Sequence, residues 1–255
     1  MVTRKSKAEV ARMRQAGRIV AEVLALVEAE LKPGVSTGHL DRIAEAHIRA
    51  AGAIPSFKGY PGINPQRPFP ASLCISIDDE IVHGIPGERV IREGQIVSVD
   101  AGAILDGWHG DAARTFYVGT PPPDVARLID ATRSAMQAGI AAAVVGHHIE
   151  DISAAVEDVA RPLGLGVIRQ FVGHGIGTEM HEEPQVPNYR TGSRGTELQP
   201  GICLAIEPMF TLGSGDVHVE PDGWTVTTSD GALAAHFEHT IAVTADGPQI
   251  LTSIQ

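Results

Sequence analysis

The sequence predicts an α+β fold made of two related halves. A pair of helical segments followed by β-rich segments occurs twice, once in about residues 1–120 and again in about 121–255. No linker, low-complexity tract or shift in composition divides the 255 residues, and 43% hydrophobic with 20% charged residues is an ordinary globular balance. We therefore expect residues 1–255 to form a single domain built from these two halves.

The first half begins with two helical patterns. Apolar residues at helical spacing predict a helix over Lys7–Leu31, which Lys32-Pro33-Gly34 ends. Ser36 or Thr37 can cap a second helix that runs to about Ala51. The proline-rich loop that follows, residues 55–70, carries three aromatic side chains, and a loop of this length is often functional.

A hairpin with two aspartates follows the strand expected at Leu73–Ile77 and a turn at His83–Pro86. Its strands are predicted at 96–101 and 108–118. If the connecting loop is the four residues 104–107, Asp100 lies directly opposite Asp111, roughly 5 Å away. Two like charges at that distance are unfavourable unless a positive charge lies between them. From this stretch alone, a bound cation and two solvated turn aspartates both remain open.

The second half repeats the plan. Helices are predicted over 124–145 and 149–161. Strands are predicted over 167–172, 202–206 and 224–228, and a last one over 235–244.

Three further segments of the chain contain residues that can bind metal. A glycine-rich loop over 171–184 presents His174 and His181, and it lacks the lysine of a phosphate-binding loop. Glu207 ends an apolar strand, where burial without a partner is costly, and Glu238 shares a strand face with His236. Each of these residues alone is weak evidence for a site.

Together, the four carboxylates and one imidazole suit a site for two divalent metal ions. Asp100, Asp111, Glu207 and Glu238 carry a formal charge of about −4, which two divalent cations would balance. Oxygen-rich ligation with one nitrogen, from His174, favours Mn, Fe(II) or Co over a structural zinc. Two metal ions roughly 3.5–4 Å apart polarise a carbonyl and activate a shared water, so the expected reaction is hydrolysis of an amide or ester.

These residues stand in motifs that resemble those of type I methionine aminopeptidases. The motifs in order are HGIP, VSVDAG, GWHGDAARTF, GHGIG, MHEEP, IEPM and FEHT, and they contain His83, Asp100, Asp111, His174, His181, Glu207 and Glu238. The resemblance covers nearly the whole chain. It implies the "pita-bread" fold, in which a curved antiparallel sheet is backed by helices with pseudo-twofold symmetry. It also implies removal of the initiator methionine from nascent chains with a small second residue.

The resemblance implies a role for each of these residues. Asp100 would bind one metal ion, Asp111 and Glu238 would bridge both, and His174 and Glu207 would bind the other. As catalytic residues, Glu207 would also carry the proton, His181 would stabilise the oxyanion, and His83 would contact the scissile amide nitrogen. The methionine pocket maps onto Phe57, Tyr60, Cys74, Met180 and Trp224.

Three features depart from the family pattern. Gly62–Pro70 resembles an insertion, which affects the assignment of the aromatic residues before it. Met180 stands where an aromatic residue is common and makes a more pliable wall. His236 stands where glutamine is usual, and we expect this titratable group to steepen the loss of activity at acid pH.

Two other functions remain as alternatives. Xaa-Pro aminopeptidases and dipeptidases share the fold and the five ligands, but they typically carry a large extra N-terminal domain. A catalytically inactive binding protein usually lacks some of the ligands, whereas all five are present here.

Charge, cysteines and hydropathy bear on partners and compartment. A net charge of −11 argues against a general nucleic-acid binder. The resemblance implies peptide and nascent-chain N-termini as partners. A basic cluster near the N-terminus is either a solvated helix face or a patch for transient ribosome contact; it contains Arg4, Lys5, Lys7, Arg12, Arg14 and Arg18. Two cysteines, no signal peptide and no apolar stretch long enough for a membrane favour a cytoplasmic protein. The fold that the resemblance implies suggests a monomer.

Overall fold

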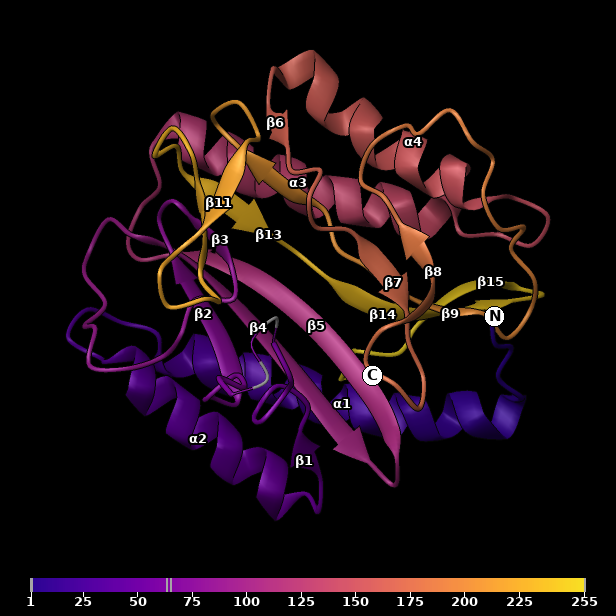
Figure 1. The fold of residues 1–255 in the computed structure, drawn as a ribbon, viewed down its shortest axis with the longest axis horizontal. Helices are drawn as coiled ribbons and strands as arrows, with labels where there is room; N and C mark the ends of the chain where they lie inside the picture. Colours follow the sequence, from indigo (N-terminus) through magenta and orange to yellow (C-terminus); the bar gives the residue numbers. More distant parts are fainter. Residues whose placement is uncertain (1, 63, 65, 255) are drawn as a thin grey trace.

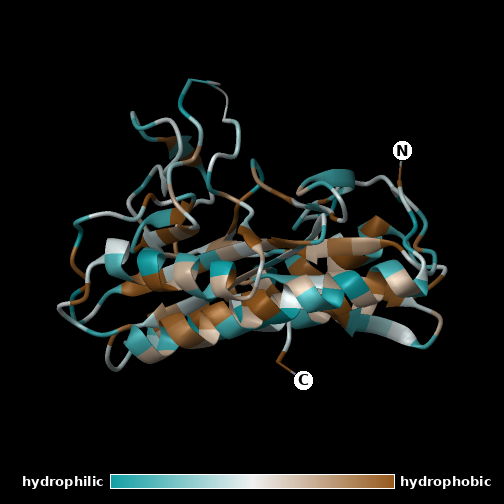
Figure 2. Cartoon of the chain, turned by 90° about the horizontal axis from the view of Figure 1, so that it is seen from below, coloured by the Kyte–Doolittle hydropathy of each residue, from teal (hydrophilic) through white to brown (hydrophobic). Residues whose placement is uncertain are grey.

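The computed structural model describes residues 2–62, 64 and 66–254. The helices form a layer against one side of the β-sheets (Figures 1 and 2). Loops extend from the opposite side of the sheets (Figures 1 and 2). The helices are α1 (Lys7–Glu30), α2 (Thr37–Ala50), α3 (Pro123–Ala142) and α4 (Ile149–Ala160), and the 3₁₀ turn η1 (Arg161–Leu163) follows α4. All four predicted helices are therefore present, with ends that differ from the prediction by up to three residues.

Local signals in the sequence explain where the helices start. Ser6 accepts a hydrogen bond from the Glu9 backbone, and the Glu9 side chain accepts one in return from the Ser6 backbone, which forms a capping box at α1. Ser36 caps α2 through the backbone N–H of His39. α3 begins at Pro123, because proline is favoured in the first turn of a helix.

The first half of the chain builds a four-stranded antiparallel sheet that lies against α1 (Figure 1). Its strands are β1 (Ile54–Pro55), β2 (Leu73–Ile77), β4 (Ile96–Leu105) and β5 (Trp108–Tyr117). α1 packs on β4 and β5, and α2 packs on α1, β1 and β2. Buried Val and Ile side chains of β4 and β2 form one apolar core with α1 and α2.

The second half builds a five-stranded antiparallel sheet with α3 and α4 beside it. In sheet order its strands are β15 (Gly247–Ile250), β14 (His239–Thr244), β9 (Cys203–Ile206), β7 (Gly173–Gly175) and β8 (Glu182–Val186). Two three-stranded sheets complete the fold: β13 (Ala234–His236), β10 (Met209–Thr211) and β6 (Gly166–Val167), and β11 (Val217–Val219), β12 (Val226–Thr228) and β3 (Glu80–Val82).

The halves are joined by hydrogen bonds between β5 and the segment that precedes β14. Ala113 and Glu238 exchange backbone hydrogen bonds of 3.3 and 2.9 Å. The Thr240 hydroxyl accepts from the Asp111 backbone N–H and donates to the Asp111 carbonyl. β5 of the first half thus runs beside the segment that carries Glu238.

The expected register of the aspartate hairpin is wrong. The connection is the two-residue turn Asp106-Gly107, with φ of 49° and 80°, because an Asp-Gly pair readily adopts the positive φ angles of a type I′ turn. Asp100 therefore pairs with Ala113, and Asp111 pairs with Gly102. Since side chains two residues apart share a strand face, the two aspartates are diagonal neighbours on one face.

Three predicted strands also differ from the structure. The strand expected at 167–172 is replaced by the short β6 and then, after a gap, by β7, so His174 lies on a strand and not in a loop. The β7–β8 pairing has a bulge between His174 and Gly175, and a Cβ at Gly175 would overlap the Glu183 carbonyl of β8. The strand expected at 224–228 begins only at Val226.

The strand expected at 235–244 is broken at Phe237-Glu238, and β15 follows it. At the break, the chain changes partner from β10 to β5 and then to β9. No helix among the described residues is both long and apolar enough to cross a membrane.

Candidate active site

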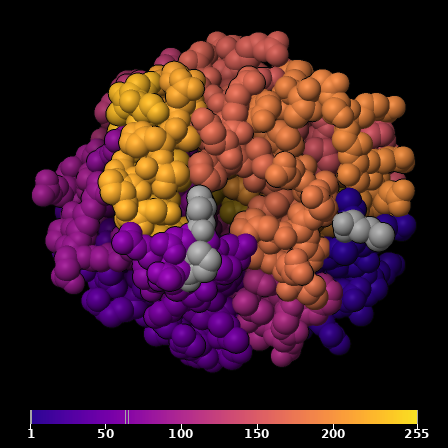
Figure 3. All heavy atoms as spheres, viewed as in Figure 1, coloured from indigo at the N-terminus to yellow at the C-terminus, as the bar shows by residue number. Residues whose placement is uncertain are grey.

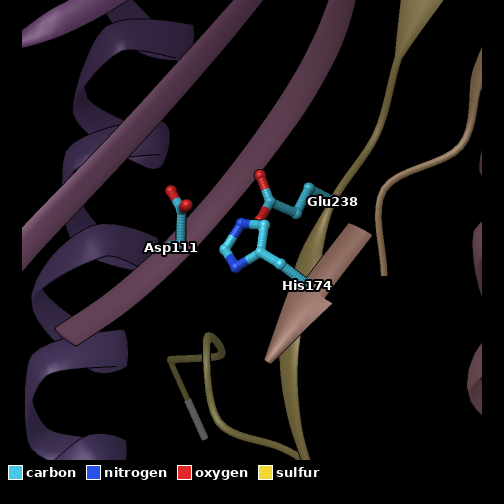
Figure 4. Close-up of side chains that lie close together, drawn as sticks. All are labelled: Asp111, His174 and Glu238. Atoms are coloured by element: carbon cyan, nitrogen blue, oxygen red, sulfur yellow. The ribbon is translucent and has the colours of Figure 1, made fainter. Parts of the chain in front are cut away.

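All five predicted metal ligands line one cavity, and both halves of the chain contribute them. Figure 3 shows the surface hollowed where the two halves meet. The ligand atoms of Asp111, His174 and Glu238 all lie within 4.8 Å of one another (Figure 4). Glu207 adjoins this group, with Oε1 3.4 Å from His174 Nε2. Asp100 lines the same cavity. We call these five residues the cage.

The cage carboxyls are buried without enough partners. Asp111 and Glu238 are only 3% and 2% exposed. One oxygen each of Asp100, Asp111 and Glu238 has no hydrogen-bond partner among the described residues. Such groups destabilise a fold unless a ligand pairs with them.

Burial also shifts the acidity of these groups. Loss of solvation raises the pKa of Asp100 to about 7 and that of Glu207 to about 8. Burial, and then repulsion from neighbouring carboxylates, raises the pKa of Asp111 and Glu238 well above the ordinary value. A set of oxygen donors that repel one another and lack partners fits divalent cations at this position.

The His174 ring presents a free nitrogen lone pair. Its Nδ1 lies 2.9 Å from the Gly175 carbonyl, which can only accept, so Nδ1 carries the hydrogen and Nε2 has the free lone pair. Burial, followed by the nearby His181, lowers the pKa of His174 to about 3. A backbone carbonyl that fixes the tautomer in this way is typical of metal-binding histidines.

An apolar pocket adjoins the cage. All five predicted pocket residues line it, namely Phe57, Tyr60, Cys74, Met180 and Trp224. Phe69 completes this wall, and its ring lies edge-on to Trp224 with centroids 5.1 Å apart. Phe171 and Val172 also line the cavity. The sequence offered one signal for Phe69, an aromatic residue in a proline-rich loop.

Hydrogen bonds join the two ends of the Gly62–Pro70 segment, so the segment does not interrupt the pocket wall. Ile63 and Pro65 lie outside the described residues. On either side of them, Gly59 donates to the Phe69 carbonyl and Phe69 donates to the Tyr60 carbonyl. Because these bonds join the two ends of the segment, the aromatic residues before it still reach the cavity.

His83 and His181 stand at the boundary between the cage and the pocket. His83 has a φ of 62°, which non-glycine residues rarely adopt and which often marks functional positions. Its ring lies edge-on to Phe171 and Trp224, and burial lowers its pKa to about 4. His181 lies edge-on to His174, with ring centroids 4.3 Å apart.

The structure adds His236 to the surroundings of the cage. Its ring is buried, and Nε2 lies 3.6 Å from Glu207 Oε2 with no hydrogen-bond partner among the described residues. His236, Glu207 and Glu238 also form a group with ligand atoms within 4.8 Å. The shared strand face of His236 and Glu238 was its signal in the sequence, and the expected effect on the acid limb stays a prediction.

Comparison with known proteins places this site in a family. Residues 11–245 match the model of metallopeptidase family M24. The chain belongs to this family. A methionine aminopeptidase of Clostridium acetobutylicum is 50% identical over 253 residues, which are 99% of each chain. A methionine aminopeptidase 1 of Mycobacterium tuberculosis is 49% identical and covers 99% of this chain and 95% of its own length.

Solved M24 structures share the fold. Methionine aminopeptidases from Rickettsia prowazekii and Thermotoga maritima superpose with TM-scores of 0.94 and 0.95, each at 38% identity, and cover 99% of this chain and all of their own. The pita-bread fold implied by the sequence motifs is thereby confirmed. A prolidase from Pyrococcus furiosus, at 21% identity and TM-score 0.80, shares the fold, and the match spans only 66% of its length.

Proposed function

We propose that this M24 enzyme removes the N-terminal methionine from peptides and nascent proteins whose second residue is small. The supporting observation is the adjacency of the cage to a pocket walled by aromatic side chains, Cys74 and Met180. Such a lining suits a thioether, since sulfur–aromatic contacts contribute about 0.3–1.5 kcal/mol each. The full-length relatives named methionine aminopeptidases support the same substrate.

The cage would hold two divalent metal ions. Asp100 would bind one, Asp111 and Glu238 would bridge both, and His174 and Glu207 would bind the other. Mn, Fe(II) and Co are the candidates, because the set is rich in oxygen and has one imidazole. When bound, the ions supply Lewis acidity and lower the pKa of water. Since each half contributes ligands, we propose that residues 1–255 act as one catalytic domain of two halves, about 1–120 and 121–255.

Protein side chains would move the protons and orient the substrate. Glu207 would accept a proton from the attacking water and pass it to the leaving amine. His181 would donate to the oxygen of the scissile carbonyl. His83 would contact the amide nitrogen, and the free α-amine of the substrate would lie near Asp100. Recognition of that amine makes the enzyme an exopeptidase.

The decisive assay compares two tripeptides with metal-loaded protein. Release of methionine from Met-Ala-Ser, with Ala-Pro-Ser left intact, supports the proposal. Cleavage of Ala-Pro-Ser alone would assign the chain to the Xaa-Pro aminopeptidases. No cleavage of either peptide would favour an inactive binding protein.

We further propose that the enzyme works as a monomer in the cytoplasm, where nascent chains emerge and where both buried cysteines stay reduced. The N-terminal basic cluster could meet the ribosome, although Lys5 is buried in a 2.6 Å ion pair with Glu182 and so does not belong to that surface. Neutralising Arg12, Arg14 and Arg18 should reduce co-sedimentation with ribosomes. Unchanged co-sedimentation would remove this proposal.

A further inference from the structure

Tyr60 directly connects the apolar pocket to His181. Its hydroxyl lies 2.6 Å from Nδ1 of the His181 ring, and the two rings lie edge-on with centroids 5.4 Å apart. The backbone around Tyr60 is held on both sides, since its N–H donates to the Phe57 carbonyl and its carbonyl accepts from Phe69. The hydroxyl is therefore presented to His181 by a fixed part of the pocket wall.

The direction of this hydrogen bond decides what His181 can do. A neutral imidazole carries one hydrogen, so the partner of Nδ1 determines the state of Nε2. If the Tyr60 hydroxyl donates, Nε2 carries the hydrogen and can donate to a substrate oxygen. If Nδ1 donates instead, Nε2 can only accept, and the ring cannot stabilise an oxyanion.

The surroundings favour the tyrosine as the donor. The Tyr60 hydroxyl lies 2.6 Å from Nδ1, and of the two groups the phenol is the better donor and the imidazole nitrogen the better acceptor. Burial also raises the pKa of Tyr60, so its hydroxyl keeps its hydrogen. His181 lines the cavity beside His174 and Glu207, the place where a substrate carbonyl must lie for hydrolysis at the cage. A ring that faces this position is useful only as a donor.

We propose that Tyr60 is a positioning residue whose hydroxyl donates to His181 Nδ1 and holds the ring in the tautomer that presents Nε2–H to the scissile carbonyl. This inference rests on the proposed function for its catalytic meaning. It also gives one side chain two tasks, because the ring of Tyr60 forms part of the methionine pocket while its hydroxyl sets the state of the catalytic histidine.

The tautomer can be read directly from the metal-free protein. Histidine labelled with ¹⁵N is observed by NMR at pH 8, and the His181 signals are assigned by their loss in His181→Asn. The wild type should show Nε2 protonated and Nδ1 unprotonated. Tyr60→Phe keeps the ring but removes the donor, so its His181 signals should move towards a mixture of tautomers. Protonated Nδ1 in the wild type, or an identical tautomer in Tyr60→Phe, would overturn the proposal.

Kinetics on the metal-loaded enzyme give the second readout. Loss of one neutral hydrogen bond worth about 1 kcal/mol should lower kcat on Met-Ala-Ser roughly fivefold in Tyr60→Phe, with KM within about twofold. Tyr189→Phe is the matched control, because Tyr189 contacts Arg169 and does not line the cavity, and it should leave both constants unchanged. A rise in KM at constant kcat would instead make Tyr60 a wall residue alone. An inactive wild type would refute the proposed function, while the NMR result would still test the tautomer.

Discussion

The cage and the pocket wall lie side by side but are built in opposite ways. Cage residues lie on or directly beside strands of both halves, and one oxygen each of Asp100, Asp111 and Glu238 is buried without a partner among the described residues. Most wall residues lie on loops, and their aromatic side chains pack against one another. The cage therefore costs folding free energy that a bound cation can offset, whereas the wall contributes to stability as any apolar cluster does. Under the proposed function, the cage would carry the chemistry and the wall would select the substrate.

The largest expected effect is at the centre of the cage. Asp111→Asn removes a charge that would bridge both ions. We expect kcat/KM on Met-Ala-Ser to fall on the order of 10³-fold or more, which corresponds to a loss of several kcal/mol of transition-state stabilisation. Asp106→Asn is the matched control, because it makes the same exchange in the exposed turn of the same hairpin, where asparagine is well tolerated. Similar activity in both variants would contradict the account of the cage.

Removal of metal should make stability depend on pH in a defined direction. Because burial raises the pKa of Asp100 to about 7 and of Glu207 to about 8, the metal-free folded chain holds more protons than the unfolded chain, whose carboxyls titrate near roughly 4. The free energy of unfolding should therefore fall as pH rises from 5 to 8, by about 1.4 kcal/mol per pH unit for each extra proton held.

Urea denaturation in the presence of a chelator measures this slope. Added Mn²⁺ should restore stability most at the upper end of the range, by about 2.7 kcal/mol at a concentration a hundredfold above Kd. If the chelated protein is equally stable at pH 5 and pH 8, the cage carboxyls do not have raised pKa values in the metal-free fold, and this account is contradicted.

Substitutions in the pocket wall should mainly change substrate binding, measured as KM. Trp224 contacts Phe69 and His83, and its Nε1 donates to the Arg67 carbonyl at 3.0 Å. Trp224→Ala should raise KM for Met-Ala-Ser roughly tenfold, since loss of apolar contacts in a pocket costs about 1–3 kcal/mol. Trp224→Phe keeps a ring and should change KM much less. A fall in kcat at unchanged KM in the alanine variant would mean that Trp224 acts on the reaction itself.

The smallest effect is expected at Met180, which is buried in the wall. Methionine is flexible, so this wall should accept an ethionine side chain, which is one methylene longer. Met180→Phe should lower kcat/KM for the ethionine tripeptide roughly threefold more than for Met-Ala-Ser, because a rigid aromatic ring cannot move aside for the extra methylene as methionine can. Met180→Leu, which is also pliable, should preserve the ratio. If the ratio of kcat/KM for the two tripeptides is the same in the wild type and in both variants, this residue does not set the depth of the pocket.

The cage was predictable from sequence because its residues stand in short motifs on strongly patterned segments. Four helices and the strand Leu73–Ile77 followed from periodicity and capping residues. The hairpin register failed because the Asp106-Gly107 turn was taken as part of a four-residue loop. This error shifts every pair in the ladder by two residues and keeps each side chain on its predicted face.

The parts that could not be predicted depend on contacts distant in sequence. The break before Glu238 arises because that residue bonds to β5 of the other half, which no local pattern reveals. Phe69 joins the wall only through its contact with Trp224, and Tyr60 meets His181 across 121 residues of chain. Periodicity reports on local structure, and these pairings are set by the tertiary fold.

The most direct test of the account is anomalous diffraction from crystals grown with Mn²⁺. Two anomalous peaks should appear inside the cavity, roughly 3.5–4 Å apart, with Asp111 and Glu238 in contact with both. Peaks only outside the five cage residues, or none at a concentration that supports activity, would contradict the claim that paired cations make this buried cluster of carboxylates tolerable.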